Sequence, residues 1–235
     1  MKRATLLIFA LLTALPTTSS GDNLFSMKSS LIDLSRVNKT TSRKLKKMGA
    51  DQYTRYDQFE LSVAGELEPS KYHYNHMAFE IKESIDNVWN AYLSASPKDS
   101  WSGKNIQFDF AYSKRDQNVY YGDGDVPNAH EGMGVFILLK ILRLGKISAA
   151  MEISKIDHET RTIEYTYLLK NTSNGRQIIR LTELGSRKTR LDHDTYFTSG
   201  KRWRDAIYPK IHESLVSELH RNVMGQIYAP IIRIE

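Results

Sequence analysis

The order of structural elements that the sequence predicts between residues 74 and 224 limits the possible folds more than any other feature. A strand comes first, followed by a short amphipathic helix, a series of strand-like segments and one long amphipathic helix. Short turns separate the strand-like segments, which predicts antiparallel pairing because parallel strands need crossover connections. We therefore predict an α+β fold in which a curved antiparallel sheet wraps around a long C-terminal helix. This arrangement leaves a cavity that suits an apolar ligand.

Alternating apolar residues predict the individual strands. Met77, Phe79 and Ile81 alternate with polar or small residues, and Ser84 is a good N-cap for the helix that follows. Residues 135–144 are so uniformly apolar that they fit either a buried strand or a short helix. Further strands are predicted at residues 106–112, 118–121, 147–156, 162–170, 177–183 and 189–198, the last two as a hairpin.

The long helix begins near Ser199 and Gly200 and carries a wide apolar stripe. Pro209 lacks an amide proton, so it is expected to kink the helix or divide it into a short and a long piece. A stripe of this width needs a large apolar partner, for which the concave face of the sheet is suited. The stripe steps by four residues through Trp203, Ile207, Ile211, Leu215, Leu219 and Val223, and is widened by Tyr208, Val216 and Met224.

Residues 1–20 have the three parts of a secretory signal peptide. Lys2 and Arg3 precede an apolar run over residues 4–15, and small residues follow it. The alternative is an uncleaved N-terminal anchor, although the run is short for a membrane span. The chain has no cysteine, which excludes disulfides and thiolate metal sites. We therefore predict an exported protein, periplasmic or secreted.

The rest of the chain divides into three predicted parts. Residues 21–70 are an N-terminal extension, residues 71–228 the main domain and residues 229–235 a C-terminal tail. The formal charge of +6 is small for this length and does not indicate a nucleic-acid-binding protein. A basic cluster in the extension fits an anionic membrane surface, or a solvated helix end whose cations complement the helix dipole, which we favour. The cluster consists of Arg43, Lys44, Lys46 and Lys47.

Four segments carry a resemblance to a known family. They are MAFEIKESIDNVWNAYLS, the GMG before the middle strands, ISKIDHETRTIEYTY, and RQIIRLTELGSRKTRLDHDTYF before the last helix. Over residues 74–224 the layout resembles the START-like (SRPBCC, helix-grip) superfamily of lipid-transfer proteins, polyketide cyclases and plant pathogenesis-related proteins. The resemblance implies a cavity for a hydrophobic ligand such as a lipid, fatty acid or sterol. Only some members are enzymes, so we favour a protein that binds without catalysis.

An acidic loop and a histidine-containing strand could carry chemistry, but their spacing argues against it. Pro127 and the missing last acidic ligand break the calcium-loop pattern around Asp123 and Asp125, so no metal is predicted. Asp192 and Asp194 flank His193, but neighbours in a strand point to opposite faces and cannot form a charge relay.

The orientation of the histidines stays open at this level. His193 shares a face with Leu191, and it would meet a ligand if that face is the inner one and solvent if it is the outer one. His212 and His220 are two helical turns apart, too distant to share a metal, and we expect them on the polar face. No nucleophile elbow or phosphate-binding glycine loop is present.

Aromatic and basic side chains are the candidates for the ligand cavity, although core packing is the commoner role of aromatic residues. Tyrosines place a hydroxyl at the end of an apolar ring, and arginines pair with acidic head groups. No catalytic residue and no cofactor is predicted, and the expected partner is a small hydrophobic ligand. The predicted cavity residues are Phe108, Phe110, Tyr120, Tyr165, Tyr167, Arg190, His193, Tyr196, Trp203 and Arg204.

Three functions fit these observations. The first is an exported carrier of a hydrophobic ligand, which requires an interior that side chains leave unfilled. The second is a cyclase- or hydrolase-type enzyme on the same scaffold, which requires an inward titratable residue with a shifted pKa in a reachable pocket. The third is a non-catalytic surface module, which requires a filled interior and an exposed apolar patch.

Overall fold

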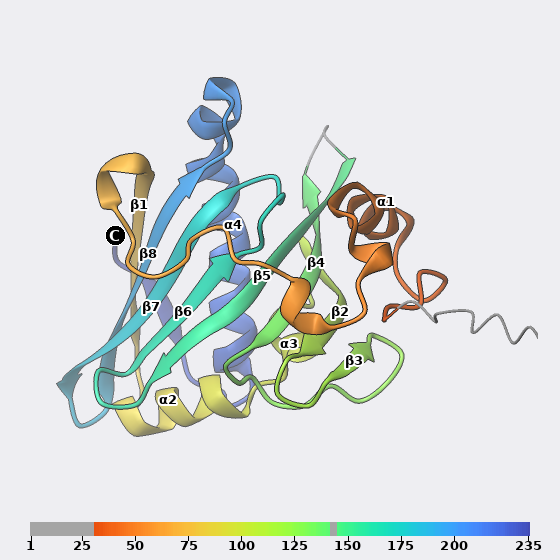
Figure 1. The fold of residues 1–235 in the computed structure, drawn as a ribbon. Helices are drawn as coiled ribbons and strands as arrows, with labels where there is room; N and C mark the ends of the chain where they lie inside the picture. The colour runs from red at the N-terminus through yellow and green to blue at the C-terminus, as the bar shows by residue number, and fades with distance from the viewer. Residues whose placement is uncertain (1–30, 142–144) are drawn as a thin grey trace, which may run out of the picture.

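A computed structural model describes residues 31–141 and 145–235, and its central element is an antiparallel sheet of nine strands (Figure 1). The predicted signal peptide lies outside the described residues. The sheet order is β3-β2-β4-β5-β6-β7-β8-β1-β9. The strands are β1 (His73–Ile81), β2 (Ile106–Ser113), β3 (Asn118–Tyr121), β4 (Met133–Ile141), β5 (Gly145–Asp157), β6 (Thr162–Tyr167), β7 (Asn174–Gly185), β8 (Lys188–Thr198) and β9 (Ile231–Arg233).

Four α-helices accompany the sheet in the described part of the chain: α1 (Lys39–Met48), α2 (Ile85–Ser94), α3 (Pro97–Ser100) and α4 (Arg202–Gly225). Three short 3-10 turns, η1 (Ala50–Gln52), η2 (Tyr56–Gln58) and η3 (Pro69–Lys71), lie in the N-terminal extension. Asn87 N–H donates to the Ser84 hydroxyl at the start of α2, as the sequence predicts. Among the described helices, none is long and apolar enough to cross a membrane.

The sheet curves around α4, which confirms the predicted α+β fold. Leu215, Leu219 and Val223 of α4 are buried against the strands, together with side chains from α2 and with Trp101, which follows α3. Pro209 lies inside α4, which runs from Arg202 to Gly225 without a break, so the expected division into two pieces is wrong and the expected kink stays a prediction. Of residues 135–144, which fitted a strand or a helix equally well, residues 135–141 belong to β4, and residues 142–144 lie outside the described residues.

The described part of the N-terminal extension, residues 31–70, packs on the face of the sheet opposite α4. In Figure 1 the chain between α1 and β1 crosses in front of the strands, while α4 runs behind them. Leu45, Met48 and Phe59 form a second apolar core with Phe136 and Ala150 of the sheet. The sheet is therefore covered on both faces over β2, β4 and β5. The predicted C-terminal tail is also structured, because residues 231–233 pair with β1 as β9.

A β-bulge in β2 decides which core each aromatic side chain joins. The register with β4 shifts between Phe108 and Phe110. Because a bulge adds one residue, Phe108 faces α4, whereas Phe110 and Tyr112 face the extension. Phe108 and Phe110 are both predicted from the sequence as cavity residues, and the bulge places them on opposite faces of the sheet. Asp109, at the bulge, accepts hydrogen bonds from the Asn38 N–H that starts α1.

Candidate functional site: an apolar cavity under helix α4

An apolar cavity of about 120 Å³ lies between α4 and the sheet. Its walls come from β4 and β5 on one side and from α4 on the other, and Ile137, Met151 and Leu215 are typical of the lining. Trp203, which is 58% exposed to solvent, lies at the open end of the cavity. Helix packing against a curved sheet thus leaves space that the side chains do not fill, as the carrier hypothesis requires.

The inner wall of the cavity carries a small polar group. Tyr167 of β6, Gln177 of β7, and Tyr208 and His212 of α4 all line the cavity. Gln177 Nε2 donates to the Tyr167 hydroxyl at 2.8 Å, and the hydroxyls of Tyr167 and Tyr208 are hydrogen-bonded. Tyr208 also stacks on Phe197, with 3.8 Å between ring centroids. These contacts fix α4 against β6, β7 and β8 beside the cavity.

Behind this wall, a chain of buried histidines connects α4 to the sheet. His193 Nε2 lies 2.9 Å from Gln177 Oε1, and His193 Nδ1 lies 3.0 Å from His220 Nε2. His220 Nδ1 lies 2.5 Å from the Tyr92 hydroxyl of α2. His212 Nε2 lies 3.3 Å from the same Gln177 oxygen. Polar contacts therefore run from α2 to the cavity through the centre of an apolar core.

Gln177 Oε1 determines where the protons lie in this network. A carbonyl oxygen only accepts, so Nε2–H of His193 and Nε2–H of His212 both donate to it. Neutral His193 then has an accepting Nδ1, which accepts a hydrogen bond from Nε2–H of His220, and His220 Nδ1 accepts one from the Tyr92 hydroxyl. His212 is left with an accepting Nδ1, which is buried and has no hydrogen-bond partner among the described residues. One acceptor beside the cavity is thus unsatisfied.

Burial keeps all three histidines neutral. It lowers the pKa of His212 to about 3 and, with a smaller repulsion from His212, the pKa of His220 to about 3. Burial, and next repulsion between the protonated forms of His193 and His220, hold the pKa of His193 well below its ordinary value. Burial also raises the pKa of Tyr167 to about 12, against the effect of its hydrogen bonds. At neutral pH the inner wall formed by Tyr167, Gln177, Tyr208 and His212 therefore presents uncharged polar groups.

Three of the ten residues predicted from the sequence line the cavity: Tyr167, Trp203 and Arg204. His193 faces inward but lies behind the lining, bonded to Gln177. Phe108 and Tyr165 belong to the main core without lining the cavity. The prediction that Asp192 and Asp194 point away from His193 is confirmed, since both contact His76 of β1 instead.

The remaining four predicted residues lie elsewhere. Phe110 belongs to the second core, because of the bulge in β2. Tyr120 lies on edge strand β3, 3.3 Å from an Asp116 oxygen. Tyr196 stands across from Tyr74 in neighbouring strands, with ring centroids 5.1 Å apart.

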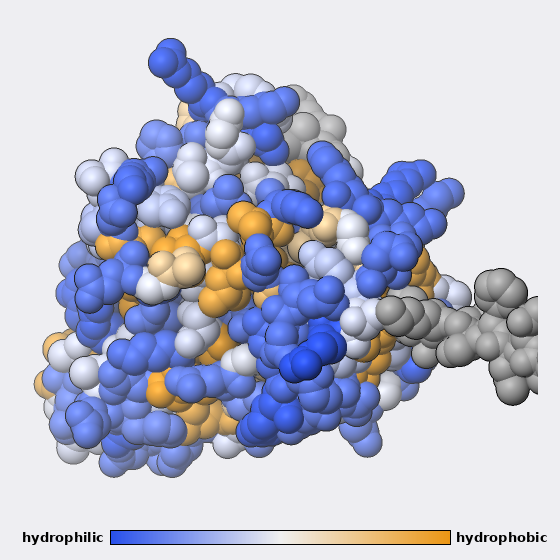
Figure 2. Space-filling model, viewed as in Figure 1, coloured by the Kyte–Doolittle hydropathy of each residue, from blue (hydrophilic) through white to orange (hydrophobic). Residues whose placement is uncertain are grey.

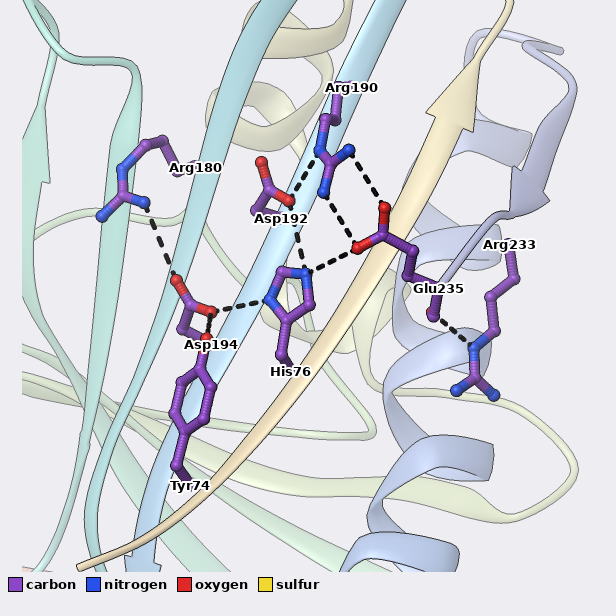
Figure 3. A network of polar contacts seen from close by, with 8 residues as sticks. All are labelled: Tyr74, His76, Arg180, Arg190, Asp192, Asp194, Arg233 and Glu235. Carbon is purple, nitrogen blue, oxygen red and sulfur yellow. Dashed lines mark hydrogen bonds and ion pairs between the residues drawn. The ribbon is translucent and has the colours of Figure 1, made fainter.

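Arg190 belongs to a polar network on the face of the sheet that points away from α4 (Figure 3). Its guanidinium donates to Asp192 at 2.8 Å and to both oxygens of Glu235. His76 Nδ1 lies 2.8 Å from Asp194 in the same network. Arg190 and Tyr196 face outward because His193 faces inward, and side chains alternate along a strand. Neither residue can reach the cavity.

Sequence reasoning missed Gln177, Tyr208, His212 and His220 as members of one network. It placed His212 and His220 on the polar face of the helix, and this expectation is wrong because both are buried. The sequence did contain a signal for their burial, because both histidines lie on the same helix face as apolar residues of the stripe, spaced four residues apart. The residues in this row are Tyr208, His212, Val216, His220 and Met224.

Two residues in or just after the acidic loop considered from the sequence have structural partners. Asp123 pairs with Arg36, which also lies over the Tyr121 ring. His130 is hydrogen-bonded to the Ser113 hydroxyl at 2.8 Å. In the parts of the chain that the structure describes, no group of three or more histidine or acidic residues is placed to hold a metal ion.

The sheet, the enclosed helix and the cavity between them define a helix-grip domain. The structure is similar to that of norcoclaurine synthase from Thalictrum flavum in complex with dopamine and hydroxybenzaldehyde (TM-score 0.49, 10% identity, 71% of this chain and 94% of that chain). It is also similar to a START superfamily protein from Mycobacterium smegmatis (TM-score 0.47, 12% identity, 66% and 97%). A third similar structure is major latex-like protein 151 from Panax ginseng (TM-score 0.46, 14% identity, 66% and 96%). No family model and no curated protein matches the chain.

Proposed function

We propose that the protein binds a small, largely apolar molecule in the cavity under α4 and keeps it apart from water. The observation that carries this proposal is an unfilled apolar space inside an otherwise packed core. Burying apolar ligand surface there contributes roughly 25 cal/mol per Å² before the costs of association. The space is small in this conformation, which favours a short chain or a ring system over a bulky lipid.

The competing surface-module function has less support. This function requires an interior filled by side chains, whereas the cavity is unfilled. It also requires a broad apolar patch on the exterior. Figure 2 shows one face of the molecule, on which hydrophobic residues form separate patches between hydrophilic ones. Scattered patches of this kind are common on proteins that do not assemble through them.

An acid-base enzyme is the second candidate, because His212 is a titratable residue that lines the cavity. Its unpartnered Nδ1 could accept a proton from a bound molecule. However, burial lowers its pKa to about 3, which makes it a weak base at neutral pH. We therefore favour binding. Recovery of a bound ligand in chemically unchanged form after prolonged incubation supports binding, and a converted product supports catalysis.

Native mass spectrometry of the purified protein, followed by organic extraction, tests the binding function directly. We expect a small apolar molecule near one-to-one stoichiometry. For protein that purifies empty, octanol binding can be followed by tryptophan fluorescence, because Trp101 and Trp203 line the cavity. Ala149→Phe places a ring into the cavity and should abolish this response.

Ala206→Phe is the matched control for the cavity variant. Ala206 lies on exposed surface of α4 and does not line the cavity, so this variant should bind octanol as the original protein does. Protein that carries no extractable molecule and gives no saturable octanol response would overturn the proposed function. Equal loss of binding in both variants would also count against the cavity as the site.

A further inference from the structure

A second hollow adjoins the open end of the apolar cavity. It measures about 420 Å³ and lies at the surface between α1, the start of β5, the loop after β6 and the start of α4. The two spaces share Ile147, Asn171, Thr172, Ser199 and Arg204 as lining residues. A single bound molecule could therefore extend from the cavity into the hollow without leaving the protein surface.

This hollow, which we call the basic pocket, is lined by cations from four separate elements. No carboxylate lines it. None of the cations forms an ion pair with an acidic residue in the described parts of the chain, although many other lysines and arginines do. The cations are Arg43, Lys44 and Lys47 of α1, Lys146 of β5, Lys170 after β6 and Arg204 of α4.

Several of these cations are held in place by neutral oxygens. Lys44 Nζ donates to the Ser148 carbonyl at 2.9 Å and to the side-chain oxygen of Asn171. Lys170 Nζ donates to the Met48 carbonyl at 3.2 Å. Neutral acceptors orient the ammonium groups but leave their charge uncompensated. Lys44 and Arg204 are partly buried, so their positive charge without a counter-ion is costly, and a bound anion removes that cost.

Arg204 connects the two spaces. Its Nη2 lies 3.4 Å from the Ser199 carbonyl, while its Nε is buried and has no hydrogen-bond partner among the described residues. A guanidinium with an open donor suits a carboxylate or phosphate, which accepts two parallel hydrogen bonds from such a group. Arg204 therefore stands where an apolar chain leaving the cavity would place a polar head.

The helix dipole explains only part of the cluster. Lys47 lies in the last turn of α1, where a cation complements the partial negative charge of the helix end. Lys146, Lys170 and Arg204 come from other elements, so the dipole of α1 gives no reason for their convergence. Repulsion between these neighbouring cations opposes their convergence. Burial and the nearby charge of Lys47 lower the pKa of Lys44 to about 7.

We propose that the basic pocket binds the anionic head group of the ligand whose apolar part occupies the cavity. The ligand is then an amphipathic anion with a carboxylate or phosphate at Lys44, Lys47 and Arg204 and a short apolar chain or ring under α4. This inference rests on the proposed function and adds the charge and orientation of the ligand. It also assigns the basic residues of α1 to the binding site, in place of the solvated helix end that the sequence favoured.

Octanoate and octanol have similar chains and differ in charge. Comparing their affinities therefore distinguishes the contribution of the basic pocket from that of the apolar cavity. Tryptophan fluorescence or calorimetry should give about tenfold tighter binding of octanoate, the preference that one charge-assisted hydrogen bond supports. In Lys44→Met/Lys47→Met this preference should disappear, while octanol affinity stays unchanged. The matched control is Lys39→Met/Lys46→Met, which removes the same charge from the same helix outside the pocket and should keep the preference.

The outcomes separate the two proposals. Equal affinity for octanoate and octanol overturns the head-group assignment and leaves the proposed function standing. If neither ligand binds, the proposed function is overturned.

An equal loss of octanoate preference in both double variants attributes the effect to net charge and overturns the assignment of the basic pocket. Binding to vesicles of anionic lipid that needs Lys44 and Lys47, without any octanoate preference, replaces the assignment with membrane docking. If inorganic phosphate competes with octanoate but not with octanol, the head-group assignment is supported.

Discussion

His193 Nδ1 lies 3.0 Å from His220 Nε2, so two buried imidazoles from β8 and α4 share one hydrogen bond. Both must be neutral for this bond to form without placing positive charge in the apolar core. Through Gln177 the pair is linked to His212 and hence to the wall of the cavity. The same network therefore fixes α4 on the sheet and sets the polarity of the binding space.

Acid should destabilise the protein through these histidines. In the unfolded chain each takes up a proton near pH 6.5, whereas in the folded protein the pKa of His212 and that of His220 are about 3. The unfolded state thus binds more protons than the folded state below about pH 6.5. As the pH is lowered from there, the free energy of unfolding decreases by about 1.4 kcal/mol per pH unit for each histidine. Urea unfolding at several pH values measures this slope.

His212→Gln should reduce that slope by the contribution of one histidine. The exposed His158 offers the control, and His158→Gln should leave the slope unchanged. A free energy of unfolding that stays constant between about pH 7 and pH 5 would contradict the buried neutral histidine network.

Gln177→Leu should strongly destabilise the protein. The change removes the acceptor for His193 and His212 and the donor to Tyr167, leaving buried polar groups without partners. Each such group costs about 1–3 kcal/mol, so a loss of several kcal/mol in urea unfolding is expected. Gln107→Leu, at an exposed position of β2, should change stability by less than about 0.5 kcal/mol. Similar values for both variants would show that the network does not stabilise the fold.

Gly134→Ala tests the attachment of the N-terminal extension. A Cβ at Gly134 would lie 2.1 Å from the ring of Tyr112, which stacks on Phe59 and donates to Glu152. The ring cannot move without disturbing the second core, so we expect a loss of about 1–3 kcal/mol or more in thermal unfolding. Gly225→Ala is the control, because its Cβ would meet open space near the end of α4. Equal melting temperatures for both variants would rule out this close packing.

The affinity for octanoate should fall as pH rises through the pKa of Lys44, which is about 7. Below that pH the ammonium is charged and attracts the carboxylate, whereas above it the neutral amine does not. A decrease of about tenfold between pH 6 and pH 9 is expected, because the carboxylate itself stays ionised over that range. Arg43 and Lys47 on α1, and Lys146, Lys170 and Arg204 on the facing elements, contribute a further positive field.

Lys44→Met isolates the contribution of this one group. In that variant octanoate affinity should be weak at all pH values and its dependence on pH should largely vanish. Octanol affinity should not follow the same profile in either protein. A pH dependence that survives in Lys44→Met would assign the titration to another group.

The sequence is sufficient to predict the architecture. Period-two patterns, short turns and one long amphipathic stripe permit few arrangements other than an antiparallel sheet around a helix. It also determined that His193 points away from Asp192 and Asp194, since strand geometry requires it. These features depend on neighbours in the chain, and local geometry is enough to predict them.

The binding site, by contrast, depends on contacts between segments that are distant in the sequence. A single bulge turns Phe110 away from α4, and no local pattern predicts where a bulge falls. His212 and His220 are polar residues that pattern reasoning assigns to solvent, yet Gln177 and Tyr92 supply partners that allow their burial. Lys44 and Arg204 are 160 positions apart in sequence, yet they line one pocket. Burial, hydrogen bonding and electrostatic field depend on which distant segments meet, and the folded chain alone specifies that.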